Sequence, residues 1–487
     1  MSPLRGMSFV DVIVGTTLVL IVFLGIFGLL RASLQVSGLA KLKAAATEIA
    51  ESQLEYIRSL EYDEVGTMGG IPSGIIPQHA TTTNAGVAFG VRTYIVYVDD
   101  DADGLGVLDA TSITTDYKVA KVTVSYTAGG TTRDVTLISN IAPNGIETTT
   151  GGGTLRVSIV DAVGLPVSGA TVHIQNSSTN PAIDFSTFSD VTGTVFLPGA
   201  PTSTEYRIEV TKTGYSTAET YARDATNVNP TPGYLTVVGG STTSGTFAID
   251  LLASFILRTF SPIRAFVALD PMNTTDGFSS FTNTQVIGSA LTLSGSAGSY
   301  QENGSAVGDA LTPEYLVSWT SASSTRVVPA ATDVRISVGD ATGTLLPDAV
   351  LSGNSLGFTG TIDLSGIATT TYPSLTLLAT FTSSDPNVTP QLLDWEIGYD
   401  AGPIPLPDVD FTLVGAKTVG STAGGAALYK TEIASSTDTL GEYEAELEWD
   451  SYALTVSGYD IVSVSPEAPF EVLPNTQTEA SLILTPQ

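Results

Sequence analysis

The feature that most constrains this chain is an uncharged apolar stretch, Val12–Leu30, close to its N-terminus. At about 1.5 Å per residue, a helix over this stretch is about 28 Å long, about the thickness of a bilayer's hydrocarbon core. A short leader with Arg5 and Gly6 precedes it, and the acid Asp11 stands at its start. A secretory signal peptide carries its small-residue cleavage site after the apolar region. Here a cut at the leader glycine would remove the basic residues and keep the apolar stretch.

The helical pattern continues beyond the apolar stretch. Apolar residues recur at three- to five-residue spacing with charged residues between them, at Leu34, Leu39, Leu42, Ala46, Ile49, Leu54, Ile57 and Leu60. Gly66, Gly69 and Gly70 then provide a stop signal. The pattern predicts one helix from about Ser8 to Leu60, roughly 80 Å long, whose second half can lie on a globular domain.

The N-terminus resembles the class III leader of type IV prepilins and pseudopilins, in which the leader ends in Gly and the fifth mature residue is an acid. The resemblance implies that prepilin peptidase cuts after Gly6, that Met7 becomes the methylated N-terminus, and that Phe9 and Asp11 serve in assembly. Two departures stand out: the family usually has Glu where this chain has Asp11, and no proline kinks the apolar half.

Electrostatics suggests a role for Asp11. A carboxylate near hydrocarbon costs several kcal/mol unless it is paired. In a filament of parallel, axially staggered helices, the amine of one subunit can meet Asp11 of its neighbour and fix the register. The alternative is an interfacial Asp at the start of an ordinary single-span anchor. The combination of Gly6, the Arg-bearing leader and the long helix favours the prepilin interpretation.

Composition indicates an extracytoplasmic protein built largely of β-strands. The chain of 487 residues has no Cys and a net charge of −30, which argues against nucleic-acid partners. The length suggests three or four domains after the helix. Short β-branched runs between Gly, Pro, Asn and Asp clusters predict strands. The expected fold class is α+β, a long helix with a small antiparallel sheet followed by a string of all-β sandwich modules.

Composition shifts divide the chain into six segments. They are a leader (1–6), a transmembrane and stem helix (7–63), a pilin-like β head (64–147), an immunoglobulin-like sandwich (148–253), a β-sandwich with weak jelly-roll resemblance (254–402), and a second immunoglobulin-like sandwich (403–487). The first sandwich resembles carboxypeptidase-regulatory modules, which are structural and carry no catalytic residues. Clear alternation in 91–98 and 117–126 predicts a sheet that covers the amphipathic half of the helix.

The last segment repeats the first sandwich in looser form. Three pairs of segments are matched: 409–413 with 155–159, Asp438–Tyr443 with Asp190–Gly193, and 452–459 with 206–215. The run at 403–407, PIPLP, is interpreted as a stiff boundary before this second copy. Two related sandwiches in one chain suggest a stalk of stacked modules.

An acidic loop in the head is a candidate calcium site. It places acids at alternate positions before a glycine, as calcium loops do: Asp99, Asp101, Asp103 and Gly104. The acid expected at the twelfth position is replaced by Ala110, and Asp109 comes one residue earlier. The alternative is a solvated acidic hairpin tip. A bound calcium would stabilise the fold and would not catalyse a reaction.

No constellation supports an enzyme. Gly353–Gly357 matches the nucleophile-elbow pattern, but no helical pattern follows it and both histidines, His79 and His173, precede it. The match is therefore interpreted as chance. Trp319, Trp395 and Trp449 are expected in the packing, with Trp319 kept open as a sugar platform.

The sequence therefore predicts a non-enzymatic structural subunit, a pilin or minor tip pilin, of a type IV pilus or related filament. Its predicted partners are other pilins through the N-terminal helix, prepilin peptidase, the inner membrane, and a surface glycan or protein ligand for the β modules. It is expected in the cytoplasmic membrane as a single-pass protein before assembly and in an extracellular filament afterwards. The alternative is a single-span surface adhesin or carbohydrate-binding protein that does not polymerise.

Overall fold

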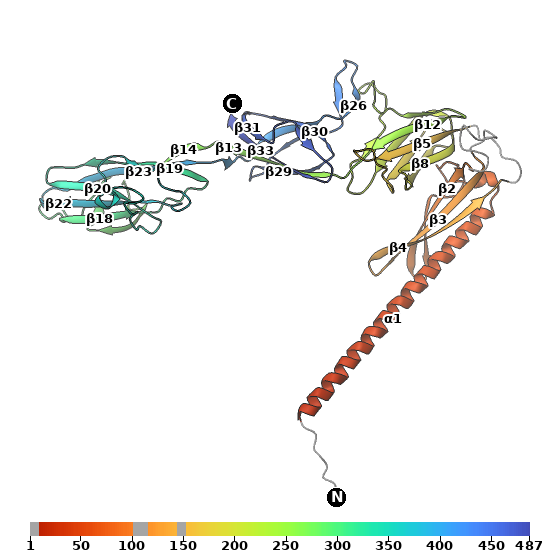
Figure 1. Ribbon diagram of the computed structural model, residues 1–487, viewed down its shortest axis with the longest axis horizontal. Coiled ribbons are helices and arrows are strands. Elements are labelled where there is room, and N and C mark those ends of the chain that lie inside the picture. Colours follow the sequence, from red (N-terminus) through yellow and green to blue (C-terminus); the bar gives the residue numbers. More distant parts are fainter. Residues whose placement is uncertain (1–8, 101–114, 144–151) are drawn as a thin grey trace, which may run out of the picture.

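The first element of the computed structural model is a long helix, α1, Phe9–Arg58. The structure describes residues 9–100, 115–143 and 152–487, and omits the side chains of residues 10–12. Helix α1 is followed by a short 3-10 turn, η1, Tyr62–Glu64. Figure 1 shows α1 projecting from the β modules as a rod. This confirms the predicted fold class, one long helix followed by many sheets.

A four-stranded antiparallel meander packs on the C-terminal half of α1 and forms the head. Its order is β1-β2-β3-β4, with β1 His79–Asn84, β2 Val87–Val98, β3 Tyr117–Ala128 and β4 Thr131–Ile141. Strand β2 alternates between two cores: Val91 and Ile95 face α1, whereas Tyr94 and Val96 pack against the next module. Strand β2 is therefore covered on both faces and joins the helix to the next module.

The next module, here called the proximal sandwich, consists of two sheets. Its strands are β5 Gly153–Val160, β6 Thr171–Asn176, β7 Ile183–Phe188, β8 Thr194–Ala200, β9 Ser203–Thr211, β10 Ala218–Glu219, β11 Leu235–Val237 and β12 Thr242–Ala248. One sheet has the order β12-β5-β8; the other has β10-β9-β6-β7, with β11 on β9. The first and last strands, β5 and β12, pair in parallel, which closes the module.

The C-terminal sandwich is discontinuous in sequence. Its strands are β13 Ala253–Ser261, β24 Ile404–Pro405, β25 Asp410–Gly415, β26 Thr418–Ser421, β27 Ala427–Tyr429, β28 Glu432–Ser436, β29 Glu442–Leu447, β30 Asp450–Val456, β31 Tyr459–Ser465, β32 Phe470–Val472 and β33 Gln477–Pro486. Strand β13 lies between β33, which is parallel to it, and β29, which is antiparallel. The predicted boundary at residue 254 assigned this strand to the middle module, and that assignment is wrong. Strand β13 belongs to the C-terminal sandwich, because it buries Phe255 and Leu257 in the core of that module.

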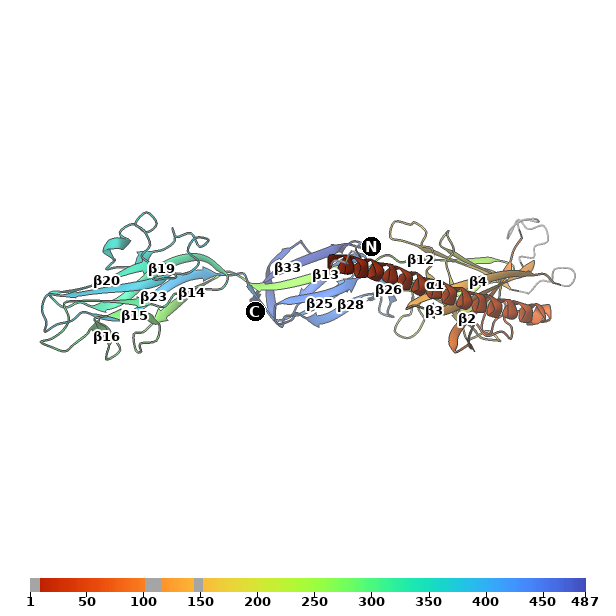
Figure 2. The same cartoon turned by 90° about the horizontal axis from the view of Figure 1, so that it is seen from below.

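The distal sandwich is an insert between β13 and β24. It contains β14 Arg264–Asp270, β15 Phe278–Thr282, β16 Thr284–Val286, β17 Leu291–Leu293, β18 Asn303–Gly308, β19 Leu316–Val327, β20 Thr332–Gly339, η3 Asn354–Leu356, β21 Ile362–Asp363, β22 Thr376–Ser383 and β23 Gln391–Ala401. Its sheets are β16-β17-β23-β19-β21 with β14 on β23, and β15-β18-β22-β20. The outgoing and returning chains lie side by side, since Ser261 pairs with Ile404. Figures 1 and 2 place this insert at the end of the row of modules.

The proximal and C-terminal sandwiches match in topology, but not entirely as predicted. Strand β25, which contains 410–413, pairs with β28 and β30 as β6 pairs with β7 and β9. The predicted match of 409–413 with 155–159 is therefore wrong. Strand β25 corresponds to β6, the strand after β5, and the counterpart of β5 is β13. The match at the tyrosines is confirmed: Tyr206 and Tyr452 are buried, and each hydroxyl donates to a backbone carbonyl upstream, of Pro201 and Glu448 respectively.

Asp190 and Asp438 occupy the same turn in the two sandwiches. In each, one carboxylate oxygen accepts the backbone N–H groups two and four residues later, at 2.8 Å. Asp161 and Asp340 form the same turn elsewhere in the chain. A glycine in the left-handed region completes all four Asp-x-x-Gly turns, at Gly164, Gly193, Gly343 and Gly441.

A hairpin of the C-terminal sandwich, β26–β27, docks on the proximal sandwich. The backbone N–H groups of Val228 and Thr231 donate to the carbonyl oxygens of Ser421 and Val419, at 3.1 and 3.0 Å. The side-chain amide of Asn227 also donates to the Val419 carbonyl, at 2.9 Å. We call this set of contacts the latch. It adds an extended segment of one module to a loop of another and so fixes the joint between them.

Candidate functional site: the apolar stem

The N-terminal half of α1 exposes apolar side chains in every direction. From Ile13 to Val36, the large hydrophobic residues of the helix are all exposed, and Leu34 is 66% exposed. Within the described residues, this is the one helix that is long and apolar enough to cross a membrane, a criterion that signal sequences and core helices also meet. Thr16 and Thr17 donate their hydroxyls to the carbonyl of Ile13, so these polar groups are satisfied inside the helix.

The C-terminal half of α1 is packed against the head. Ala46, Ala50, Leu54 and Ile57 are buried against strands β3 and β4. Arg58 fastens the end of the helix by donating to the Ser139 hydroxyl from two guanidinium nitrogens, at 2.9 and 3.1 Å. The exposed Leu34 belongs to the free half, because contact with the head begins further along the helix than the sequence pattern suggested.

Two of the predicted processing and assembly residues, Phe9 and Asp11, lie at the free end of α1. Gly6 and Met7 fall outside the described residues. Phe9 is the first residue of the helix and is 80% exposed. Asp11 lies in the first turn, and its side chain is not among those described. Phe9 and Asp11 thus stand at the tip of the rod, far along the helix from the head.

The predicted calcium loop falls largely outside the described residues. Asp101, Asp103 and Asp109 belong to the stretch 101–114, which the structure does not describe. Asp99 is buried just after β2. In the described part of the chain, no three His, Cys, Asp or Glu residues are grouped as a metal site. Calcium binding therefore stays a prediction.

Sequence reasoning missed Lys118, which holds the stem to the head. This lysine is 2% exposed on β3, and its ammonium donates to the carbonyl oxygens of Tyr62 and Val65, at 2.6 and 2.7 Å. It also lies 4.3 Å from the centre of the Tyr62 ring. Burial lowers the pKa of Lys118 to about 8, against an opposing attraction from Asp63. The sequence did contain a sign of this role. Along β3, Lys118 falls in the same alternating series as Ala120 and Val122, whose side chains are buried.

The remaining candidates have structural roles. Within Gly353–Gly357, Asn354 is buried. Its side-chain oxygen accepts the Val338 N–H at 2.7 Å, and its side-chain nitrogen donates to the Val338 carbonyl at 2.8 Å. The Ser355 hydroxyl donates to Asp348 and faces no histidine. Trp319 is 0% exposed and donates from its indole nitrogen to the Tyr372 carbonyl, at 2.9 Å. Trp319 therefore offers no face for a sugar.

Comparison with models of known families gives no match, and neither does comparison with curated proteins. Several solved structures show a distant likeness. The TIE protein of Bacillus anthracis is 10% identical, with 84% of this chain and 73% of that chain covered and a TM-score of 0.18. The major pilin subunit of Bacillus cereus is 9% identical, with coverage of 68% and 99% and a TM-score of 0.15. A streptococcal ancillary pilin is 7% identical, with coverage of 75% and 77% and a TM-score of 0.18. Because these values are low, they transfer no function, and the residues of this chain must support any proposal.

Proposed function

We propose that the chain is a structural subunit of a type IV pilus or a related extracellular filament, assembled through α1. The observation that carries this proposal is the division of α1 into two halves. The C-terminal half is fixed to the head by Ala46, Ile57 and Arg58. The free half presents apolar side chains all round, and its large hydrophobic residues from Ile13 to Val36 are all exposed.

An apolar rod of this kind needs a non-aqueous environment. Burying each large apolar side chain is worth about 1.5–3 kcal/mol, so the exposed residues between Ile13 and Val36 together favour transfer from water by tens of kcal/mol, to order of magnitude. A bilayer meets this need before assembly, and neighbouring helices meet it in a filament. Gly15, Gly25 and Gly28 leave open space on the helix surface, where a second helix can approach closely.

The leader supports the filament over a permanent anchor. Under this proposal, prepilin peptidase removes the residues up to Gly6, Met7 becomes the methylated N-terminus, and Asp11 pairs with the amine of a neighbouring subunit. The protein passes from the cytoplasmic membrane to an extracellular filament of like subunits. The alternative, a single-span surface adhesin, uses the same helix and keeps Met1.

One measurement separates these two functions. Intact-mass analysis of the chain isolated from its native membrane and from sheared filaments gives the mature N-terminus. A mass that begins at methylated Met7, found in sheared filaments, supports the subunit. A mass that begins at Met1, found in the membrane alone, supports the anchor and rejects the filament proposal.

We also propose that the acidic loop of the head binds calcium through Asp99, Asp101, Asp103 and Asp109. Since a ligand that binds the folded state stabilises it by mass action, chelation should lower the melting temperature of the head. The double variant Asp101→Asn, Asp103→Asn should lose this dependence. Identical melting curves with calcium and with chelator would leave a solvated acidic loop.

A further inference from the structure

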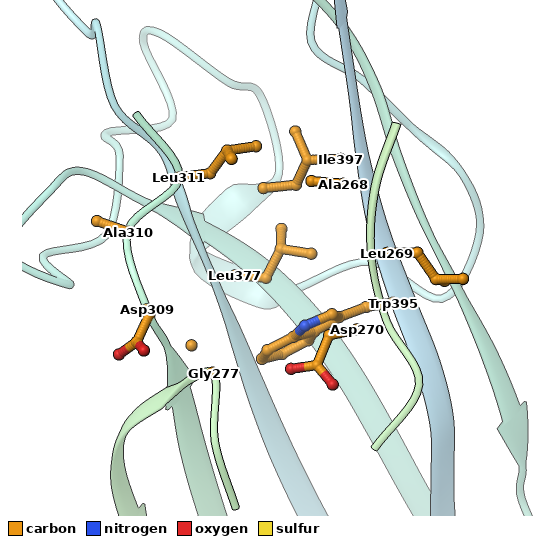
Figure 3. Close-up of a pocket in the computed structure, with 11 residues that line it drawn as sticks. Ala268, Leu269, Asp270, Gly277, Asp309, Ala310, Leu311, Leu377, Trp395 and Ile397 are labelled. Carbon is orange, nitrogen blue, oxygen red and sulfur yellow. The ribbon is translucent and has the colours of Figure 1, made fainter. Parts of the chain in front are cut away.

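A cavity of about 220 Å³ opens at one edge of the distal sandwich. It lies between β14 and the segment 308–311, which begins at the last residue of β18, as Figure 3 shows. Its apolar lining includes Leu377, Trp395 and Ile397, which are 3%, 5% and 6% exposed. These side chains belong to the core between the two sheets, so the cavity reaches that core from the edge of the sandwich.

Two carboxylates stand at one end of this cavity. Asp270 ends β14 and Asp309 follows β18, and Figure 3 shows their side chains on either side of Gly277. The Asp309 backbone N–H donates to the Gly277 carbonyl at 2.7 Å, which ties the two walls together. One oxygen of Asp270 accepts the Met272 N–H at 3.0 Å, which fixes its orientation. Its other oxygen lies where a side chain at position 277 would begin, so glycine keeps this end open.

The lining contains no basic residue to neutralise these acids. A mostly apolar cavity with two carboxylates at one end suits a ligand with an apolar stem and a cationic head. The stem gains by leaving water, and the cation gains charge-assisted hydrogen bonds. The net charge of −30 adds a long-range attraction for cations.

Other ligand classes fit the cavity less well. Sugar recognition by stacking needs a free aromatic face, whereas the ring of Trp395 packs against that of Phe278, at 5.3 Å between centroids. Calcium prefers six to eight oxygen ligands, whereas two carboxylates in a largely apolar lining supply few of them.

We propose that this cavity binds an alkyl cation, of the kind carried by lysine and arginine side chains and by polyamines. The stem lies along Leu377 and Ile397, and the ammonium or guanidinium group lies between Asp270 and Asp309. Because the distal sandwich is at the end of the row of modules, a partner can reach the site without passing the stem (Figure 1). The site does not depend on filament entry, so its failure and that of the proposed function are distinguishable.

Calorimetric titration of the full chain in detergent tests the site with a matched pair of probes, n-butylguanidinium and its neutral analogue n-butylurea. We expect the cation to saturate one site with a Kd of about 1 mM, and the urea to bind at least about tenfold more weakly. Asp270→Asn and Asp309→Asn should each weaken the cation about fivefold or more, as expected for loss of one charge-assisted contact. Because asparagine keeps the oxygen that accepts the Met272 N–H, the fold should persist.

Asp276→Asn is the control. It removes one charge from the loop that joins β14 and β15, and Asp276 is not one of the residues that line the cavity. The proposal is overturned if the urea binds as well as the cation, if Asp276→Asn weakens binding as much as the two lining variants, or if the cation does not saturate. Saturation by methyl α-glucoside that is lost in Asp270→Asn would replace it with a sugar site. Spermidine and the capped peptide acetyl-Gly-Arg-Gly-amide then distinguish a polyamine from a protein side chain as the source of the cation.

Discussion

The ammonium of Lys118 donates to the backbone carbonyl of Tyr62 at 2.6 Å, which ties strand β3 to the turn that ends the stem. The unfolded chain holds this lysine's proton up to pH about 10.4, whereas burial lowers the folded pKa to about 8. Between these values the unfolded state binds more protons, so the free energy of unfolding rises with pH. We expect a rise of roughly 2 kcal/mol between pH 8 and 10.

Lys118→Met should abolish that rise, and Lys121→Met should not, because Lys121 is exposed on the same strand. Scanning calorimetry of the full chain at pH 7.5, 8.5 and 9.5 measures how the stability changes with pH. The transition to follow is the one whose midpoint shifts in Lys118→Met. Above pH 10 stability should fall again, since burial raises the pKa values of Tyr206 and Tyr452 and their unfolded forms lose protons first. A wild-type slope that persists in Lys118→Met would assign it to other groups.

Two of the Asp-x-x-Gly turns allow two contributions to stability to be measured separately. One is the cost of a left-handed backbone for a residue with a side chain, and the other is the cost of crowding between that side chain and its neighbours. Gly164 and Gly193 both have φ in the left-handed region, at 86° and 70°. A Cβ at Gly164 would meet nothing within 4 Å, whereas one at Gly193 would lie 2.5 Å from the Ile159 carbonyl oxygen. Gly164→Ala should therefore destabilise the proximal sandwich by about 1 kcal/mol, and Gly193→Ala by about 3 kcal/mol or more. Thermal unfolding of the two variants checks this, and equal losses would contradict the role of crowding.

Periodicity in the sequence was sufficient to predict the stem and the central head strands. The amphipathic pattern correctly predicted that the second half of α1 packs on the sheet, although Leu34 at its start is still exposed. The alternation in β2 and β3 follows from the burial of their faces. Strand β1 was missed because its six residues, His79–Asn84, are all exposed and carry no apolar alternation. This strand is defined only by its backbone pairing with β2.

The insertion of the distal sandwich could not be read from the sequence. Strand β13 pairs in parallel with β33, for example Ile256 with Glu479, and no local pattern encodes a partner so distant in the chain. The PIPLP run marks the returning crossing, where Pro405 pairs with Phe260, and the outgoing crossing carries no comparable signal. The cavity was missed for a similar reason, since Asp270, Asp309 and Trp395 come together through the packing of two sheets.

The latch should depend on Gly420. A Cβ at this position would overlap the side-chain oxygen of Asn227 and crowd the Asn229 carbonyl, so Gly420→Ala should expel the hairpin from the proximal sandwich. Hydrogen exchange at the amides of Val228 and Thr231 should then rise at least about tenfold, which corresponds to a loss of about 1.4 kcal/mol of local stability. Gly425→Ala is the control: it lies in the same hairpin, has φ of 82° and would meet nothing within 4 Å. Unchanged exchange in Gly420→Ala would mean that the latch tolerates displacement.

The last prediction concerns Asp11 and the register of the proposed filament. Asp11→Ala removes the acid at the start of the apolar stretch, so the variant should insert in the membrane at least as well as the native chain. If the amine of an incoming subunit pairs with Asp11 in an apolar surrounding, the variant leaves that amine unpaired. Loss of one partner from a buried pair costs on the order of 3–5 kcal/mol, so filament yield should fall sharply.

Asp11→Glu should restore assembly because it keeps the charge, and it is the residue usual in the resembled family. Asp11→Asn keeps the size without the charge and should fail like alanine, which separates pairing from packing. The measurement is the amount of the chain in sheared filaments relative to the amount retained in the membrane. If Asp11→Ala assembles as well as the native chain, Asp11 is an interfacial residue and the amine of Met7 must find another partner, which would leave the exposed apolar half of α1 as the remaining support for polymerisation.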